Sequence, residues 1–481
     1  MESMKTVIIG AGELGRLLSL VLYWRKHDIT VVDHDVDQLN RLAQSVDVKS
    51  VLGSCTSVKV LKEAEIEHAD FFLAISGNEA ANIISCKIAS KFNPRKMKRI
   101  CRLYSSDSFS EEDGVKPNDF GIHETFSTSE EVSRQISAVL DNRYLLEKIL
   151  FGQSGALDED KKMQMDPGDE ACMATLKISG DSKLLNTPMK AMSLLRDCHV
   201  RIATVFRNGQ TVFTDGETFL FPGDRIYVAG KNRDVDSFIN NAFSEGRTDR
   251  GRIVIAGSSD DIGLLLARDA VAKGYEVTLI VMGKMQENRV LDGLQKVESN
   301  VIVLYGDPTT ESLLEEAGVD SANAFIAVTD DDEANVLSCI LAKQQGAAKV
   351  IVVTHKPEYL GIVPRLDLID CSFSTTLTSV NTIFRSLNKG ILPCDANLLK
   401  FGVGIAEYKI AKKSILVGKR LSDRPSPLPP GISLAFLFRS NGELVSPTGT
   451  TVLMAGDTVV TIVSENSGKE LEKLFSGEAV K

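Results

Sequence analysis

The first residues whose types and spacing could carry chemistry form a glycine-rich loop close to the start of the chain. The loop reads Gly10-Ala11-Gly12-Glu13-Leu14-Gly15 and has the G-x-G-x-x-G pattern. In such a loop the first glycine permits a tight turn, the second lets a pyrophosphate approach the backbone, and the third allows close helix–sheet packing. Because the loop lies between an apolar segment and a helical pattern, we expect the first amides of that helix to face a bound phosphate.

An acidic residue follows at the place where a ribose would be recognised. Asp33 ends the second apolar segment, 18 residues after Gly15. A carboxylate at this position accepts hydrogen bonds from ribose hydroxyls and repels a 2′-phosphate, so the sequence favours NAD over NADP. Asp35 is a weaker candidate because it lies beyond the end of that segment.

Further polar residues follow the next apolar segments, and ligands of parallel sheets bind outside the carboxyl ends of the strands. These residues are Ser54 after the third segment, Ser76 and Gly77 after the fourth, and Arg102 on the fifth. Arg102 can supply a cation for a phosphate, and the alternative is a surface salt bridge. We therefore predict a cofactor site without catalytic residues. The eight cysteines form no CxxC pair and have no zinc-ligand spacing, so we expect reduced core thiols and no metal.

The elements that position these residues are short apolar runs, which alternate with helical patterns. Runs such as Val7–Ile9, Thr30–Val32 and Ile100–Leu103 are rich in β-branched residues and suit strands that are buried on both faces. Strand–helix alternation predicts a parallel, doubly wound sheet. A later segment repeats the rhythm, since TVIIGAGELG resembles RIVIAGSSDDIG and AISGNEAAN resembles AVTDDDEAN. The expected fold class is therefore α/β, with two Rossmann-like domains.

The second Rossmann-like unit lacks most of the nucleotide-binding parts of the first. When Gly15 is aligned with Gly263, Ser258 replaces Gly10, Asp260 replaces Gly12 and Val281 replaces Asp33. We therefore expect this unit to be structural and expect one dinucleotide per chain. Asp307 and the acidic segment 330–333 remain, where a solvated loop is favoured over a cation or nucleotide contact.

A segment of alternating polar and apolar residues with glycine turns follows each Rossmann-like unit. ATLKISGDSKLLNTP resembles AEYKIAKKSILVGKR, and the two segments later share the turns PGD and AGD. This pattern predicts a small antiparallel β-rich module after each unit. The expected domains are a first Rossmann-like nucleotide-binding domain at 1–135, a helix and linker at 136–169, a first β module at 170–243, a second Rossmann-like domain at 252–388 and a second β module at 400–481.

Each Rossmann-like unit ends in an amphipathic helical pattern. Thr128 and Glu131 have capping-box spacing, which predicts that a helix begins there. The apolar stripe of this helix contains Val132, Ile136 and Leu140, and the stripe of the second contains Leu377, Val380, Phe384 and Leu387. Two interpretations stay open, because the stripes can pack on their own domain or form a contact between subunits.

Composition and charge exclude several classes of protein. The chain has 481 residues, of which 43% are hydrophobic and 25% are charged, as in soluble globular proteins. A formal net charge of -10 opposes binding to nucleic acid, or to an anionic membrane by charge alone. No run approaches the ~20 apolar residues of a membrane span, and the N-terminus has no recognisable secretory signal. We therefore expect a cytoplasmic location.

The motifs GAGELG, ITVVD, AISGNEAAN and AVTDDDEAN, together with the duplicated order of units and modules, resemble the RCK or KTN family. This family includes the peripheral TrkA-type subunits of bacterial Trk potassium-uptake systems, and the resemblance covers nearly the whole chain. It implies TrkA-N and TrkA-C domains in a cytosolic regulatory subunit. It also implies a ring on the cytoplasmic face of the membrane, beneath a potassium transporter of the TrkH or TrkG kind.

The resemblance further implies that NAD(H), with ATP or ADP as alternatives at the same site, binds the first domain and shifts the ring between conformations. The ligand positions that it implies are Gly10 to Leu14, Asp33, Ser76, Gly77 and Arg102. Glu13 departs from the pattern, since a carboxylate inside the loop makes ATP less welcome than NAD.

We expect this protein to act by binding rather than by catalysis, as a homo-oligomer of two or four chains. Its contact with a membrane partner would be protein to protein. An NAD-dependent oxidoreductase is the alternative from another class, although the six histidines lie in no recognisable catalytic motif. A stand-alone nucleotide-sensing protein with another partner is the third hypothesis.

Overall fold

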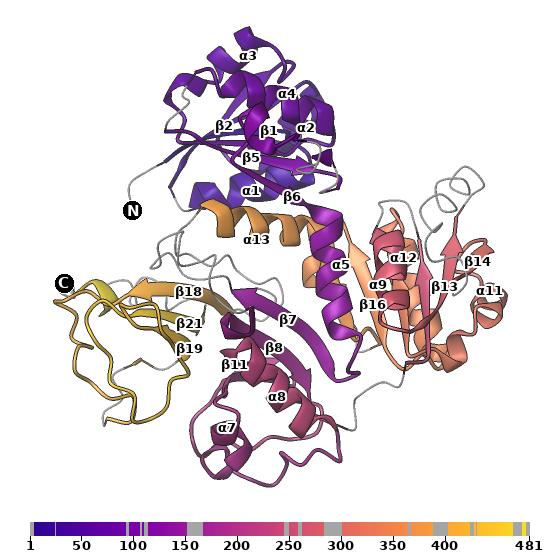
Figure 1. The fold of residues 1–481 in the computed structure, drawn as a ribbon, viewed down its shortest axis with the longest axis vertical. Coiled ribbons are helices and arrows are strands. Elements are labelled where there is room, and N and C mark those ends of the chain that lie inside the picture. The colour runs from indigo at the N-terminus through magenta and orange to yellow at the C-terminus, as the bar shows by residue number, and fades with distance from the viewer. Residues whose placement is uncertain are drawn as a thin grey trace.

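Two parallel α/β units alternate along the chain with two antiparallel β modules. The computed structural model describes residues 4–24, 26–92, 96–105, 108–109, 114–151, 167–244, 250–257, 262–282, 301–363, 366, 368–387, 403–423, 428–429, 431–464 and 474–477. In Figure 1 the first unit lies at the top, the second unit at the right, and the two modules side by side below. The expected fold class is confirmed.

The first unit is a six-stranded parallel sheet with the strand order β3-β2-β1-β4-β5-β6. Its central strands are buried on both faces, as the apolar runs predict, since the successive residues Ile8 and Ile9 point to opposite faces and are 0% and 1% exposed. The strands are β1 (Lys5–Ile9), β2 (Asp28–Asp33), β3 (Lys49–Leu52), β4 (Phe71–Ala74), β5 (Lys98–Leu103) and β6 (Glu124–Ser127). The helices are α1 (Glu13–Trp24), α2 (Val36–Ser45), α3 (Val58–Glu63), α4 (Glu79–Ala89) and α5 (Thr128–Val139).

The second unit repeats this topology with the strand order β14-β13-β12-β15-β16-β17. Its strands are β12 (Arg252–Ala256), β13 (Glu276–Val281), β14 (Val301–Tyr305), β15 (Ala324–Ala327), β16 (Val350–Thr354) and β17 (Cys371–Ser374). Its helices are α9 (Ile262–Ala272), α11 (Glu311–Glu316), α12 (Asp332–Gln345) and α13 (Thr375–Leu387).

The counterpart of Gly10 in the second unit is Gly257, so the expectation that Ser258 replaces Gly10 is wrong. The amide of Gly10 donates to Val32 and that of Gly257 to Ile280, on the second strand of each unit. The two glycines have φ angles of 108° and 113°, a conformation that favours glycine. The segment from Gly257 to Gly263 is one residue longer than that from Gly10 to Gly15. An alignment with a constant offset cannot account for this insertion, so it misplaced the counterpart of Gly10.

The two β modules pack against each other through the faces of their sheets. The shared core includes Phe151 and Tyr227 from the first module and Phe436 and Ile462 from the second. The first module contains β7 (Leu145–Phe151), β8 (Ala171–Lys177), β9 (Arg201–Arg207), β10 (Gln210–Phe213), β11 (Arg225–Lys231), α7 (Ser193–Asp197) and α8 (Asn232–Ala242). The second contains β18 (Val403–Lys409), β19 (Ile432–Phe438), β20 (Leu444–Val445) and β21 (Thr458–Ser464).

Equivalent ion pairs explain the PGD and AGD turns that the modules share. Asp224 is 1% exposed and binds Arg207 at 2.7 Å, while Asp457 binds Arg439 at the same distance. Strand β7 belongs to the first module, because it pairs with β8. The sequence placed residues 145–151 in the helix and linker, so the antiparallel sheet begins earlier in the chain than expected.

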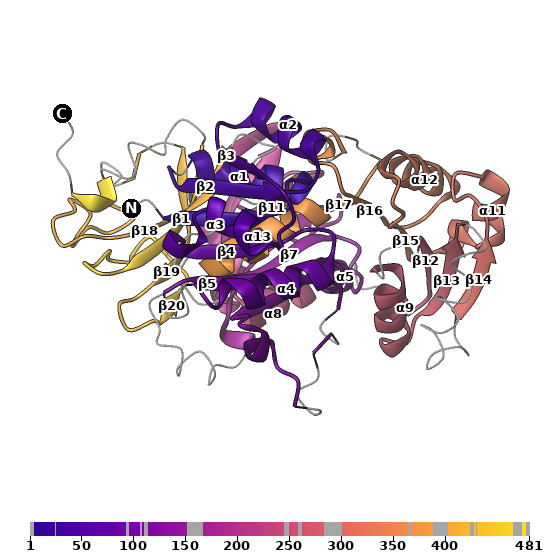
Figure 2. The ribbon, with the colours of Figure 1, turned by 90° about the horizontal axis from the view of Figure 1, so that it is seen from above.

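Helices α5 and α13 each pack on the opposite unit. Val132 and Ile136 of α5 share a core with Leu266 of α9, and Phe384 of α13 shares a core with Leu18 of α1. Figure 2 shows α13 among the elements of the first unit. The two apolar stripes therefore form a contact between the halves of one chain, which neither of the two interpretations describes. Two residues of the second stripe are exceptions: Leu377 is buried but belongs to neither of these cores, and the side chain of Leu387 lies outside the described residues.

The cap of α5 also differs by one residue from the prediction. Ser127 is the N-cap, and its side chain accepts a hydrogen bond from the amide of Glu130, whereas the capping box predicted Thr128. The hydroxyl of Thr128 instead lies 2.7 Å from that of Ser379 on α13. Among the described residues, no helix is both long and apolar enough to cross a membrane.

Candidate functional site

A cavity of about 680 Å³ lies at the carboxyl ends of the strands of the first unit. This volume is typical of a small-molecule site. It brings together every predicted site residue except Ala11. Those residues are Gly10, Gly12, Glu13, Leu14, Gly15, Asp33, Ser54, Ser76, Gly77 and Arg102.

The three glycines of the loop differ in what a side chain would meet. A Cβ atom on Gly10 would lie 2.9 Å from the Cα of Ser76, and one on Gly15 would lie 1.9 Å from the carbonyl oxygen of Gly10. A Cβ atom on Gly12 would meet nothing within 4 Å. The fold itself therefore requires the first and third glycines, whereas the second leaves open space where a phosphate can approach the backbone. The loop thus fits a dinucleotide.

Asp33 joins the end of β2 to the glycine loop. Its carboxylate accepts hydrogen bonds from the amide of Ala11 at 2.7 Å and from the amide of Asp35 at 2.9 Å, and it lies 3.1 Å from Nδ1 of His34. Ala11 is 1% exposed and does not line the cavity, so it contributes to the site only through its backbone amide, which donates to Asp33. A carboxylate has about four acceptor positions, so Asp33 retains acceptor capacity for a ribose hydroxyl.

Asn82 holds together the ends of β4 and β5, where Ser76 and Arg102 line the cavity. Its Oδ1 accepts hydrogen bonds from the amide and hydroxyl of Ser76, at 3.0 and 2.7 Å. Its Nδ2 donates to the carbonyl oxygens of Ser76 and Arg102. Asn335 makes the same contacts with Thr329 and with the end of β16 in the second unit. The repeated asparagine therefore holds each sheet edge in place.

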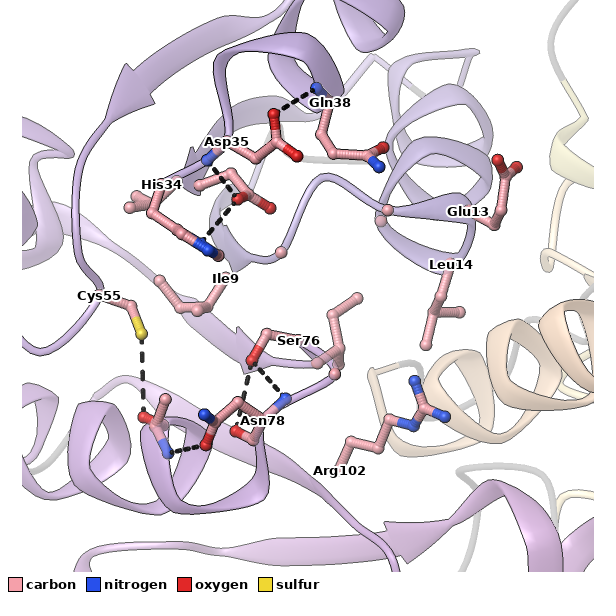
Figure 3. Close-up of a pocket in the computed structure, with 18 of the residues that line it drawn as sticks. Ile9, Glu13, Leu14, His34, Asp35, Gln38, Cys55, Ser76, Asn78 and Arg102 are labelled. Carbon is pink, nitrogen blue, oxygen red and sulfur yellow. Dashed lines mark hydrogen bonds and ion pairs between the residues drawn. The ribbon is translucent and has the colours of Figure 1, made fainter. Parts of the chain in front are cut away.

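Glu13, the acidic residue of the loop, forms an ion pair with Arg16 of α1. Its carboxylate lies 2.6 Å from Arg16, and this contact helps to raise the pKa of the Arg16 guanidinium. Arg16 also binds Glu358 of the second unit at 3.0 Å. Because Arg16 offsets part of its charge, Glu13 opposes an anionic ligand less than its position in the loop suggests. Arg102 reaches toward the cavity from β5 (Figure 3).

The second half of the chain also lines this cavity, which the sequence did not predict. His355, Thr375, Thr376 and Ser379 contribute to it, together with Thr128 at the start of α5. The repeated motif FST at 126–128 and 373–375, at the start of both crossing helices, is the sequence signal that points to this region.

A buried carboxylate holds His355 at the wall of the cavity. Asp332 is 1% exposed and accepts hydrogen bonds from the amides of His355 and Lys356, and its Oδ1 lies 2.9 Å from Nδ1 of His355. Burial alone would raise the pKa of Asp332, but these hydrogen bonds outweigh it and the pKa is lowered. The hydroxyl of Thr376 in turn donates to the carbonyl oxygen of His355.

Other residues of the first unit line the cavity without having been predicted as its ligands. They are Ile9, Val32, His34, Gln38, Gly53, Cys55, Ile75, Asn78 and Ala81, and Asp35, the weaker candidate, lines it as well. Most of them directly follow a strand end or begin the next helix, and that position is the signal that could have identified them. Asp35 caps α2, which accounts for that carboxylate, and burial raises the pKa of the Cys55 thiol.

Some of the residues predicted to weaken the second nucleotide site lie outside the described residues. Ser258 and Asp260 lie there, whereas Val281 is described and is 0% exposed at the end of β13. Among the described residues, no group of three or more His, Cys, Asp or Glu side chains is arranged to hold a metal ion. The seven described cysteines are free, and Cys394 lies outside the described residues.

Comparison with known proteins identifies related families and folds. The TrkA-N domain matches residues 6–119 and 253–370, and the TrkA-C domain matches residues 405–476. The Trk system potassium uptake protein TrkA of Vibrio alginolyticus is 25% identical over 98% of both chains. The corresponding protein of Azorhizobium caulinodans is 28% identical over 98% of both chains, and TrkA homolog 2 of Methanosarcina mazei is 27% identical over 98% of this chain and 100% of that relative.

Solved structures share the fold over nearly the whole chain. The crystal structure of the GsuK RCK domain has a TM-score of 0.61 at 17% identity and covers 99% of this chain and 96% of that chain. The structure of the GsuK channel bound to NAD has a TM-score of 0.59 at 18% identity and covers 99% of this chain and 80% of that chain. At this level of identity, the similarity defines the architecture alone.

Proposed function

This chain belongs to the TrkA family, and from that premise we propose that it is a peripheral regulatory subunit that binds NAD(H) and controls a potassium-transporting membrane protein. The observation that carries the proposal is the composition of the cavity wall, which both halves of the chain supply. The glycine loop and Asp33 come from the first unit, and His355, Thr375 and Thr376 come from the second. A ligand in this cavity touches both halves, so its affinity depends on how they are placed.

That dependence is what a regulatory switch requires. A ligand shifts an equilibrium between two conformations only by its differential affinity for them. A ~100-fold preference for one conformation corresponds to about 2.7 kcal/mol per site, and several sites in a ring add. The crossing helices α5 and α13 join the halves next to the cavity, so a small change at the ligand alters the packing between halves.

The cavity supports NAD(H) as the ligand of this site. When bound, the dinucleotide would place its pyrophosphate against the loop at Gly12 and its adenosine ribose at Asp33, and ATP or ADP would compete for the same place. The architectural relative GsuK was solved with NAD bound. Val281 occupies the position in the second unit that Asp33 occupies in the first, so the second unit lacks a carboxylate for the ribose. We therefore expect one dinucleotide per chain.

The partner in this proposal is a potassium transporter of the TrkH or TrkG kind. Relatives that match almost the whole length of the chain are named as Trk system potassium uptake proteins. We expect a closed homo-oligomer of two or four chains on the cytoplasmic face of the membrane, because each chain supplies two equivalent units to a ring. Neither membrane insertion nor nucleic-acid binding is part of the proposal.

One observation favours a second candidate, an NAD-dependent oxidoreductase. His355 lines the cavity, and its Nδ1 is held by the buried Asp332, an arrangement that also suits a general acid or base. We rank this candidate second because the β modules are small for a substrate domain. Oxidation of NADH, followed by its absorbance with a panel of carbonyl metabolites, distinguishes the two. Turnover that His355→Ala abolishes would favour the enzyme.

Binding and co-purification test the first proposal. Calorimetric titration of the full chain should give one NADH per chain and weaker binding of NADPH. Affinity purification of the tagged protein from membranes should recover a multi-span potassium transporter, in an amount that changes with NADH. Binding of NADH with recovery of an unrelated partner would instead favour a stand-alone nucleotide sensor. Absence of binding would refute the proposed function.

A further inference from the structure

Helices α4 and α12, which occupy equivalent positions in the two units, carry an exposed apolar residue at the same place. Asn82 of α4 and Asn335 of α12 make the same contacts with their sheets, so the two helices correspond residue by residue. Two residues after each asparagine lie Ile84, which is 48% exposed, and Leu337, which is 47% exposed. Single exposed apolar side chains are common in proteins, but their repetition at one position in both units indicates a shared contact surface.

The face of α4 that carries Ile84 points away from the sheet. Cys86, on the other side of the helix, is 0% exposed and belongs to the core of the first unit. Successive turns place four exposed residues on the outer face, the last of them just past the end of the helix: Ala80, Ile84, Lys87 and Lys91. This outer stripe of α4 is apolar in its first half and basic in its second half.

The corresponding face of α12 has a different distribution of charge. Its residues at the same positions are Glu333, Leu337, Ile340 and Gln344. Ile340 is partly buried, and the other three are exposed. This outer stripe of α12 is therefore acidic at its start and apolar in the middle, and it contains no basic residue.

Both stripes face away from the place where the halves of the chain are joined. In the first unit α13 and α1 pack on the face of the sheet that contains Ile8, whereas α4 packs on the face that contains Ile9. In the second unit α5 and α9 pack with Ile255, whereas α12 packs with Val254 on the other face. Because α5 and α13 form the joint, α4 and α12 lie on the outer face of their separate units (Figure 1).

The two stripes complement each other when the helices are antiparallel. With Ile84 against Leu337, Lys87 comes opposite Glu333, and the small Ala80 comes opposite the larger Ile340. An apolar centre with charged residues at its rim is the usual anatomy of a protein–protein interface. Two copies of α12 would instead bring Glu333 against Ile340, and a charge that is buried without a partner is costly.

The charged residues of the stripes have contacts within the chain that leave them available to a partner. Lys87 donates to the carbonyl oxygen of Asp119, and Glu333 lies 3.3 Å from Lys356. The side chains of Glu333 and Lys356 are 63% and 53% exposed, and exposed ion pairs contribute little to stability. An ammonium group has three donors and a carboxylate about four acceptor positions, so each group can form a further contact. We expect the charges to orient the association and the apolar pair to supply its affinity.

We propose that copies of this chain associate head to tail, with α4 of one copy packed antiparallel on α12 of the next around Ile84 and Leu337. The occupant of each stripe is a second copy of the chain, because the stripes are complementary and every chain carries both. A contact between unlike surfaces continues from chain to chain until a ring closes. This inference rests on the oligomer of the proposed function and deepens it by naming the surfaces that join the chains.

Sedimentation velocity of the full chain and of two single variants tests the proposal. The wild type should be assembled, whereas Ile84→Asp and Leu337→Asp should each be monomeric, because a carboxylate replaces one half of the apolar pair. An equal mixture of the two variants should form dimers, since the intact α4 of the Leu337→Asp chain can bind the intact α12 of the Ile84→Asp chain. If α4 instead paired with α4, Leu337→Asp alone would remain assembled, and that result would overturn the proposal.

A matched control and a charge exchange accompany these variants. Ile415→Asp makes the same kind of change at a residue of the second β module that is 72% exposed, and it should assemble like the wild type. Lys87→Glu and Glu333→Lys should each weaken the association about tenfold, and the two changes in one chain should recover most of it. Failure of the double variant to recover association would contradict the antiparallel register.

Calorimetry with NADH on the same samples separates this inference from the proposed function. Among the described residues that line the cavity, neither Ile84 nor Leu337 occurs, so both variants should bind NADH like the wild type, which also shows that they are folded. Wild-type assembly of either variant, or a mixture that stays monomeric, would overturn the inference while the proposed function stands. If the wild type binds no NADH but the variants and their mixture behave as described, the proposed function fails and the contact stands.

Discussion

Asp33→Asn removes the negative charge from the side chain that we assign to the ribose, while preserving its size. The carboxylate already accepts hydrogen bonds from the amides of Ala11 and Asp35 and lies 3.1 Å from Nδ1 of His34, so at least one of its about four acceptor positions remains for a ribose hydroxyl. The amide of asparagine retains a single acceptor oxygen, so at least one hydrogen bond between a charged group and the ribose is lost. Such a bond contributes about 1.5–3 kcal/mol, which corresponds to ~10–150-fold weaker binding of NADH.

Calorimetry with NADH and NADPH measures this effect directly. The wild type should prefer NADH, and Asp33→Asn should lose both affinity and most of that preference, because the charge that repels the 2′-phosphate is gone. Asp37→Asn, in the exposed first turn of α2, is the control for the change in net charge and should bind like the wild type. Unchanged NADH affinity in Asp33→Asn, with the protein folded, would refute the assignment of Asp33 to the ribose.

Two further predictions concern the glycine loop and the buried carboxylate of the second unit. Gly12→Ala places its Cβ in open space, so it should keep the thermal stability of the wild type but weaken NADH binding by ~10–100-fold. Gly10→Ala should instead lower the melting temperature, because its Cβ would collide with Ser76. Equal melting temperatures of the two variants would contradict this prediction. Asp332→Asn should destabilise the protein by ~1–3 kcal/mol at pH 7. Because the folded pKa of Asp332 is lowered, its contribution is present above the unfolded pKa and is lost as the pH falls through the folded value. Denaturant unfolding at pH 7 and pH 3 should therefore show a smaller difference at pH 3.

The parts of the site that lie within one unit could be predicted from the sequence, because local rules fix them. The glycine spacing and the position of Asp33 at a strand end follow from the geometry of a parallel sheet. The cavity collects these residues as that geometry requires. The roles assigned to them as ligands remain predictions that binding experiments must test.

The contribution of the second half could not be predicted, because an apolar stripe specifies burial but not the partner that buries it. Val380 and Phe384 have the same spacing whether α13 packs on its own sheet or on α1. Thr375 and Arg102 line the same cavity only because the two halves of the chain fold against each other.

Alignment by a constant offset failed for a related reason. The second glycine loop is one residue longer than the first, so the counterpart of Gly10 moves from the expected Ser258 to Gly257. Strand β7 was missed because LLEKILF lacks strict alternation, and its pairing with β8 spans a long segment of the chain. Both errors concern relations between distant residues, which local patterns do not encode.

The uptake of rubidium into vesicles that contain the proposed partner transporter tests the central claim most directly. The wild-type protein should change the rate of uptake in a manner that depends on NADH. Gly12→Asp, which puts a side chain and a negative charge where the pyrophosphate approaches, should abolish that dependence while light scattering detects the same oligomer. A normal response to NADH in Gly12→Asp, or a strictly monomeric wild type, would contradict the account.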